Sequence, residues 1–299
     1  MKKRWMVCIL LYLLFCQPVY ADGSELRIAV IDTGICVEAI KPANLMAGAN
    51  YLSPLAGTND LIGHGTAVAG IILGAERVYI KGIAPKAKLV PLVIATKTTD
   101  GDKLIGDSEV LAQAICDAID IYDCQIINIS AGTMSTGEQL QSAVEYAEEN
   151  GVILISSVGN DNQYYPANMY YPAAYETVVG VSALKRNGEV ARFSQRNDSV
   201  FICAPGDRLK LASATEGKTT FGSGTSYATA YVSGAVALLL SEDVELTPEE
   251  IRKILCESAM DLNEAGYDTT SGWGALNVDA ALLRLSELNG SISQQIGVQ

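Results

Sequence analysis

The stretch LRIAVID, residues 26–32, is a nearly continuous apolar run that ends in the carboxylate of Asp32. Such a run is typical of a strand that is buried on both faces of a parallel sheet. Similar runs follow along the chain, at 88–96, 124–130, 151–159, 177–184 and 200–206. The sequence therefore predicts a parallel sheet in which residues 26–32 form the first strand.

Segments with helical periodicity lie between several of these runs. Residues 107–123 place apolar residues at helical spacing behind an Asp/Ser start signal, and residues 136–151 do the same and stop at a glycine. Further helices are expected at 247–262 and from about Asn277. Alternating strands and helices form right-handed crossovers. The predicted fold is α/β, a single domain with a mostly parallel sheet covered by helices on both faces.

The N-terminal segment has the pattern of a signal peptide. Three basic residues at positions 2–4 precede an apolar run from Trp5 to Phe15, and Ala21 marks a cleavage site. The run is short for a membrane span, so an uncleaved anchor is the second interpretation. We expect a signal peptide at 1–21, one domain at 22–288 and a polar tail at 289–299. The prediction is a secreted protein with no stable membrane insertion after signal removal.

Net charge and cysteine spacing bear on nucleic-acid binding, zinc binding and disulfide formation. The chain has 21 Lys and Arg residues against 34 Asp and Glu residues, a net charge of −13, which argues against a nucleic-acid partner. No CxxC pair is present, which does not favour a zinc site. Most cysteines beyond the signal are expected to be small buried residues, with Cys116–Cys124 as the one candidate disulfide. Oligomeric state has no signature in the sequence.

Polar residues follow several of the predicted strands. Asp32 closes the first strand, Ser130 ends the run at 124–130 with Gly132 just beyond it, and Asn160 follows the run at 151–159. Ligands of such sheets bind beyond the carboxyl ends of the strands. We therefore expect these side chains along one rim of the sheet.

Two glycine-rich segments add a histidine and a serine. His64, the only histidine, lies in GHGTAVAG (63–70), and Ser226 lies in GTSYATAYVSG (224–234), each at the start of a predicted buried helix. For His64 alone, a solvated or capping side chain is the favoured interpretation, and Ser226 alone is explained as a helix cap. Serine becomes a nucleophile when a neutral imidazole takes its proton and a carboxylate orients that imidazole. Asp32, His64 and Ser226 supply these three groups.

Three blocks of the chain resemble the catalytic blocks of the subtilisin-like serine peptidases, the subtilase or S8-type family. They are AVIDTGI (29–35), GHGTAVAGI (63–71) and the segment 224–239, and the likeness extends over about residues 26–285. The resemblance implies that residues 22–288 form a subtilisin-like peptidase domain. It also implies four roles: Asp32 orients His64, His64 acts as general base and then acid, Ser226 forms the acyl-enzyme, and Asn160 helps to form the oxyanion hole.

The resemblance also implies how a peptide substrate binds. The segment after the run at 124–130 pairs with an extended peptide as an added strand, and two further segments wall the pocket for the residue before the cleaved bond. The substrate-binding residues implied are Ser130, Ala131, Gly132, Ser157, Val158, Gly159 and Tyr170. Tyr170 near the pocket floor favours small substrate residues, whereas Asp161 would favour a basic one.

No metal site or cofactor is assigned. Calcium is frequent in this family, but the segment 73–82 offers Glu76 as its only carboxylate, too few ligands for a site. The predicted function is a secreted serine endopeptidase acting on polypeptides. The alternative is a catalytically silent subtilisin-like domain that binds a peptide or a partner.

Overall fold

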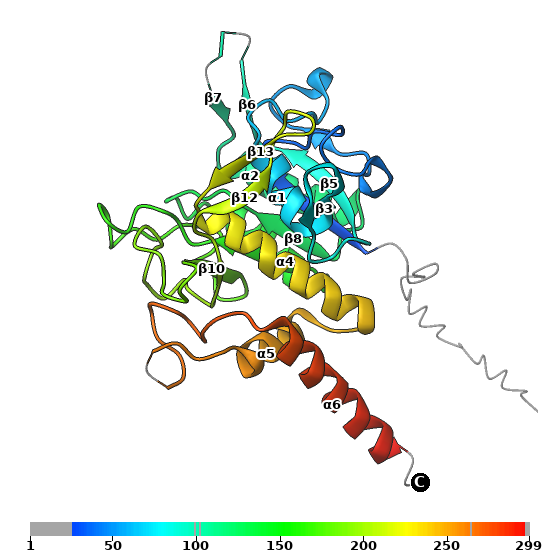
Figure 1. The fold of residues 1–299 in the computed structure, drawn as a ribbon, viewed down its shortest axis with the longest axis vertical. Helices are drawn as coiled ribbons and strands as arrows, with labels where there is room; N and C mark the ends of the chain where they lie inside the picture. The colour runs from blue at the N-terminus through cyan, green and yellow to red at the C-terminus, as the bar shows by residue number, and fades with distance from the viewer. Residues whose placement is uncertain (1–25, 99, 102, 264, 297–299) are drawn as a thin grey trace, which may run out of the picture.

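The central element of the fold is a seven-stranded sheet. The computed structural model describes residues 26–296 except 99, 102 and 264 (Figure 1). The predicted signal peptide lies outside this range. All pairs in the sheet are parallel, in the order β11-β10-β9-β8-β1-β5-β2. The strands are β1 (Arg27–Asp32), β2 (Ala49–Asn50), β5 (Lys88–Val93), β8 (Ile126–Ile129), β9 (Ile153–Ser157), β10 (Val179–Leu184) and β11 (Ile202–Pro205).

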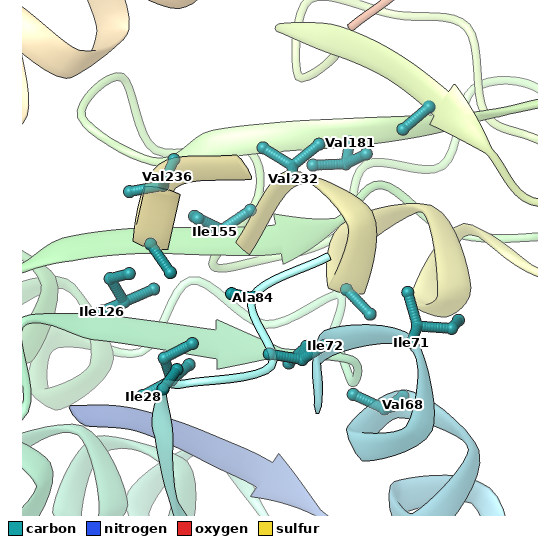
Figure 2. Close-up of a cluster of buried hydrophobic side chains, with 14 of the residues drawn as sticks. Ile28, Val68, Ile71, Ile72, Ala84, Ile126, Ile155, Val181, Val232 and Val236 are labelled. Atoms are coloured by element: carbon teal, nitrogen blue, oxygen red, sulfur yellow. The ribbon is translucent and has the colours of Figure 1, made fainter. Parts of the chain in front are cut away.

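Helices cover both faces of this sheet. On one face α1 (His64–Leu73) and α4 (Thr225–Glu242) enclose a core that includes Ile28, Ile126 and Ile155 (Figure 2). On the other face α2 (Ser108–Asp120) and α3 (Glu138–Glu149) cover a second core. The single α/β domain with a parallel sheet between helical layers is therefore confirmed.

Two further helices complete the domain. These are α5 (Pro248–Ser258) and α6 (Val278–Ile296), which pack against each other, and α6 also contacts α4. Figure 1 shows α6 extending away from the sheet. Among the helices in the described part of the chain, none has the length and apolar character that crossing a membrane would require.

Helix starts follow their capping residues. The Asp107 side chain accepts hydrogen bonds from the backbone N–H groups of Glu109 and Val110, so α2 begins at Ser108. Thr247 and Glu250 form a reciprocal capping box at α5. The sequence signals placed both helices because these contacts lie within a few residues of each other.

Short antiparallel pairs surround the sheet. The predicted strand at 88–96 ends at Val93, and the chain continues into a hairpin of β6 (Ala95–Lys97) and β7 (Lys103–Ile105). A second ribbon of β12 (Leu209–Ala212) and β13 (Thr219–Gly222) leads directly into α4. The remaining elements are β3 (Gly74–Ala75), β4 (Ile80–Lys81), η1 (Pro42–Asn44), η2 (Pro54–Ala56) and η3 (Glu76–Val78).

The last helix continues into the segment expected as a polar tail. Residues 289–296 lie in α6. Leu282, Leu285 and Leu288 pack against the main core and so hold the preceding turns of α6 on the domain. Adding residues to an existing helix is favourable, so the helix continues beyond them. A glycine inside a helix, such as Gly290, is less favourable than alanine by about 1 kcal/mol, and α6 continues past it.

The candidate disulfide is wrong. Cys116 and Cys124 are both free thiols. Cys116 on α2 borders a surface groove beside α3, whereas Cys124 is buried just before β8. Burial raises the pKa of the Cys116 thiol, which makes it less reactive. The other three cysteines of the described residues, Cys36, Cys203 and Cys256, are also free.

Candidate active site

Strand order brings the predicted polar residues to one rim. Strands β9, β8 and β1 are neighbours in the sheet and run parallel, so their carboxyl ends meet. Asp32 is the last residue of β1, Ser130 follows β8, and Asn160 lies three residues beyond β9. Helices α1 and α4 contact each other and begin at this same rim.

Asp32 and His64 form a close pair. His64 Nδ1 lies 2.7 Å from Asp32 Oδ1 and 2.9 Å from Oδ2, and the Thr33 N–H donates to Oδ1 at 2.7 Å. The Asp32 side chain is 2% exposed and that of His64 is 29% exposed, so the carboxylate is shielded while the ring reaches solvent. Gly65 permits this approach, because a Cβ there would collide with the Gly34 carbonyl oxygen.

The charge of Asp32 sets the protonation of His64. Burial disfavours the imidazolium and alone would lower its pKa, but the charge and hydrogen bond of Asp32 outweigh burial. The pKa of His64 therefore lies above its ordinary value of 6.5. Asp60 raises it further, and Lys103 on the β6–β7 hairpin opposes the rise.

Asp60 is a buried carboxylate that the sequence analysis did not assign. Its Oδ1 accepts from Thr33 Oγ1 at 2.8 Å and from the backbone N–H groups of Ile62 and Gly63 at 2.9 and 2.7 Å. Its Oδ2 accepts from the Thr66 N–H and hydroxyl at 2.9 and 2.7 Å. Asp60 thus fixes the start of α1 relative to the turn after β1. The sequence feature that could have identified Asp60 is an aspartate in a glycine-containing turn just before a helix.

Replacing Asp60 by alanine is expected to destabilise the fold. Five donors lose their charged acceptor, so the free energy of unfolding should fall by about 2–4 kcal/mol. Urea unfolding in a Ser226→Ala background, which excludes self-digestion, measures the change. The exposed Asp198 provides the matched control, and Asp198→Ala should change stability by less than about 0.5 kcal/mol. Equal stability of the two variants would contradict this role.

Ser226 lies in the first turn of α4, the helix that contacts α1, which begins at His64. Its hydroxyl donates to the Ser130 carbonyl oxygen at 3.2 Å, and the Ser130 hydroxyl donates to the Ser226 carbonyl oxygen at 3.3 Å. No hydrogen bond joins Ser226 to His64 within the described residues. The next residue, Tyr227, has its ring centroid 5.5 Å from that of His64. Hydrogen bonds between catalytic groups are often long or poorly aligned without substrate and tighten when substrate binds.

Asn160 is held by its side-chain oxygen. Asn160 Oδ1 accepts from the Thr225 N–H at 2.8 Å and from the Thr225 hydroxyl at 3.1 Å. This arrangement satisfies the first N–H of α4, whose N-cap residue Gly224 offers no side chain. The amide Nδ2 remains as the hydrogen-bond donor of the Asn160 side chain. Asn160 and Ser226 border the same cavity.

A cavity of about 310 Å³ lies beside Ser226. Its lining is Ser130, Ala131, Gly132, Ser157, Gly159, Asn160, Asp161, Tyr170 and Ser226. Six of the seven residues expected to bind substrate therefore surround one space. Val158 is the exception, since its side chain is fully buried in a cluster with Ala173 and Val200. Successive residues of an extended segment point to opposite faces, so Val158 turns inwards between Ser157 and Gly159.

Tyr170 closes one side of this cavity. An added Cβ at Gly159 would collide with the Tyr170 ring, and one at Gly132 would crowd the Tyr170 Cβ. The Tyr170 hydroxyl donates to Asp161 Oδ2 at 2.7 Å. Burial and then this hydrogen bond raise the pKa of Tyr170 above its usual value, so the hydroxyl keeps its proton.

The residues around Glu76 do not fit a calcium site. Glu76 borders a separate cavity together with Arg77 and Glu216, and those two form an ion pair. Among the described residues, no group of three or more His, Cys, Asp or Glu side chains is placed to hold a metal ion.

Comparison with known proteins places this chain in a family. The model of the subtilase family (Peptidase_S8) matches residues 23–274. The chain is 37% identical over 259 residues to the minor extracellular protease Epr of Bacillus subtilis (strain 168), covering 86% of this chain and 38% of that protein. It is 29% identical over 263 residues to subtilisin DY of Bacillus licheniformis, covering 87% of this chain and 91% of that protein.

A solved structure gives the same result. The crystal structure of fervidolysin from Fervidobacterium pennivorans, a keratinolytic enzyme related to subtilisin, superposes with a TM-score of 0.77 at 30% identity. That match covers 87% of this chain and 43% of the other, so the chain spans less than half the length of both Epr and fervidolysin. On the family match, the sequence identity and the shared fold, this chain belongs to the subtilase family of subtilisin-like serine peptidases.

Proposed function

We propose that this chain is a secreted serine endopeptidase that cleaves polypeptides through Asp32, His64 and Ser226. The observation that carries the proposal is the buried Asp32 carboxylate 2.7 Å from the only imidazole, at the start of a helix that contacts the buried helix with Ser226 in its first turn. Subtilase membership supports the same activity.

The reaction proceeds through two transfers of the acyl group. His64 Nε2 takes the Ser226 proton while Oγ forms a bond to the carbonyl carbon of the substrate. The tetrahedral intermediate collapses when His64 returns the proton to the amine, which leaves with its C–N bond broken. Water then attacks the acyl-enzyme by the same route and regenerates the serine. Asp32 keeps the Nδ1 proton in place and stabilises the imidazolium.

The negative oxygen that forms in each step needs donors. The Asn160 amide Nδ2 and the Ser226 backbone N–H supply them, since the first N–H groups of a helix have no acceptor within the helix. The oxygen of the Asn160 amide is already occupied by Thr225. The donor is therefore oriented before substrate binds.

The peptide would lie along the segment after β8. Ser130, Ala131 and Gly132 offer backbone groups to an extended chain, and Gly132 allows close approach. Ser157 and Gly159 border the cavity that receives the side chain before the cleaved bond. The signal-peptide pattern at 1–21 and the extracellular name of Epr support export. N-terminal sequencing of material from the culture medium should begin after Ala21.

Digestion of an unfolded protein tests the activity. Purified chain should release internal fragments, identified by mass spectrometry, and a Ser226→Ala variant should release none. A silent subtilisin-like domain is the second candidate, because Ser226 donates to Ser130 rather than to His64 in this structure. Tight binding of peptides without any cleavage by folded protein would favour that candidate.

The pH profile should follow His64. The neutral imidazole is the active form, so kcat/KM should rise with pH through the pKa of His64 in the folded enzyme. Because Asp32 raises that pKa, the midpoint should lie above 6.5, and activity should be lost below it. A profile flat from acid to alkaline pH would exclude His64 as the base.

Lys103 provides a finer test of the same profile. Its positive charge opposes protonation of His64, so Lys103→Glu should move the midpoint to higher pH. Lys97, its partner across the β6–β7 hairpin, is the matched control, and Lys97→Glu should shift the midpoint less. The difference should shrink in high salt, because the charge is exposed.

A further inference from the structure

The cavity beside Ser226 contains one acidic side chain. Asp161 is the only charged residue among those that line it, and the others are small, hydroxyl-bearing, amide or aromatic. Its volume of about 310 Å³ is at the lower end of the range for ligand pockets. The cavity therefore suits one substrate side chain, and the charge of Asp161 should decide which.

The two oxygens of Asp161 are not equivalent. Oδ2 accepts from the Tyr170 hydroxyl at 2.7 Å and from Asn168 Nδ2 at 3.1 Å. Oδ1 is buried, and no donor within the described residues reaches it. A buried acceptor without a partner is unfavourable, more so when it carries charge. Asp161 Oδ1 therefore lacks a hydrogen-bond donor.

The loop that carries this carboxylate is held in place. Gln195, which is fully buried, donates from Nε2 to the carbonyl oxygens of Tyr165 and Asn168 at 2.9 and 2.8 Å. The Tyr170 ring packs against Gly159 on the opposite side. The loop is thus held in place before substrate arrives, and Asp161 borders the cavity.

Resting on the peptidase function proposed above, we propose that this cavity selects lysine as the residue before the cleaved bond, with its ammonium group on Asp161 Oδ1. A lysine ammonium binds as a single point charge, which suits one available oxygen. The arginine fork binds a carboxylate best through two parallel bonds, and Oδ2 already has two donors.

Other substrate residues fit less well. Alanine would leave Oδ1 buried without a donor, and a large aromatic residue would meet the Tyr170 ring that borders the cavity. An acidic residue would be repelled by Asp161. Leucine fills space but supplies no donor, so the site rejects it for the same reason as alanine.

Peptides that differ only at the residue before the cleaved bond test this selectivity. The lysine peptide should exceed the leucine and alanine peptides in kcat/KM by about 10- to 100-fold, the range for one charge-assisted hydrogen bond. The arginine peptide should fall between them. Faster cleavage of the alanine peptide would overturn the proposal and support a shallow pocket bounded by Tyr170.

Two variants separate charge from shape. Asp161→Asn should remove the lysine preference, and Tyr170→Phe, which frees one bond on Oδ2 but keeps the ring, should raise arginine relative to lysine. Retained lysine preference in Asp161→Asn would overturn the role of Asp161.

Labelling of Ser226 by a fluorophosphonate is measured in each protein, which keeps the two proposals distinguishable. Labelled protein without lysine preference refutes the selectivity alone. Folded wild-type protein that does not label refutes the peptidase function itself.

Discussion

Ser226→Ala is expected to lower kcat by about 10⁶-fold, the loss known for the corresponding serine in subtilisin. The variant has no hydroxyl to form the acyl-enzyme, and His64 has no proton to transfer. The fold should persist, because the hydroxyl makes one hydrogen bond, to Ser130, whose loss costs about 1 kcal/mol. Hydrolysis of a peptide amide, followed at matched concentrations of folded enzyme, measures the change.

Ser241 provides the control for that substitution. It lies at the other end of α4, and its hydroxyl donates to the Ala237 carbonyl oxygen at 2.7 Å. Ser241→Ala changes the same helix in the same way, so it should keep activity within about twofold, as most surface changes away from a site do. A Ser226→Ala protein that still hydrolyses peptides at a tenth of the normal rate would contradict the covalent mechanism.

Asp32→Asn is expected to lower kcat by about 10⁴-fold, the effect of the same change in other serine peptidases. Asparagine can donate to Nδ1 and so stabilise the wrong tautomer of His64, and it removes the charge that stabilises the imidazolium. The pKa of His64 should also fall, because Asp32 contributes more than Asp60 to raising it.

The expected control is Asp207→Asn. Asp207 accepts a hydrogen bond from the Ser223 hydroxyl at 2.8 Å, near the start of α4. Its replacement should leave kcat within a few-fold. If Asp32→Asn and Asp207→Asn lose equal activity, the loss reflects general disturbance of the rim rather than the pairing of Asp32 with His64.

Much of the fold could be predicted because its signals are local. The run at 26–32 became β1, since residues buried on both faces must be apolar throughout. The starts of α2 and α5 followed from Asp107 and Thr247, whose partners lie two or three residues away. The rim also followed, because parallel strands end on the same side and thereby gather Asp32, Ser130 and Asn160.

Other features depend on contacts that no short segment reveals. In the β12–β13 ribbon, β13 is largely exposed and β12 buries only Leu211 and Ala212, so its sequence carries no apolar run. The role of Asp60 depends on Thr33, 27 residues earlier in the chain. The inward turn of Val158 depends on where β9 ends, and the free thiols of Cys116 and Cys124 depend on their separate environments. Spacing alone could not predict these outcomes.

Fluorophosphonate labelling with peptide mapping tests the central claim most directly. The reagent modifies a serine only where a base and an oxyanion site activate it. We predict stoichiometric modification of Ser226, loss of labelling in Ser226→Ala and His64→Ala, and faster labelling as pH rises through the pKa of His64. Folded protein that stays unmodified, or is modified at another serine, would show that Asp32, His64 and Ser226 do not form a working catalytic unit.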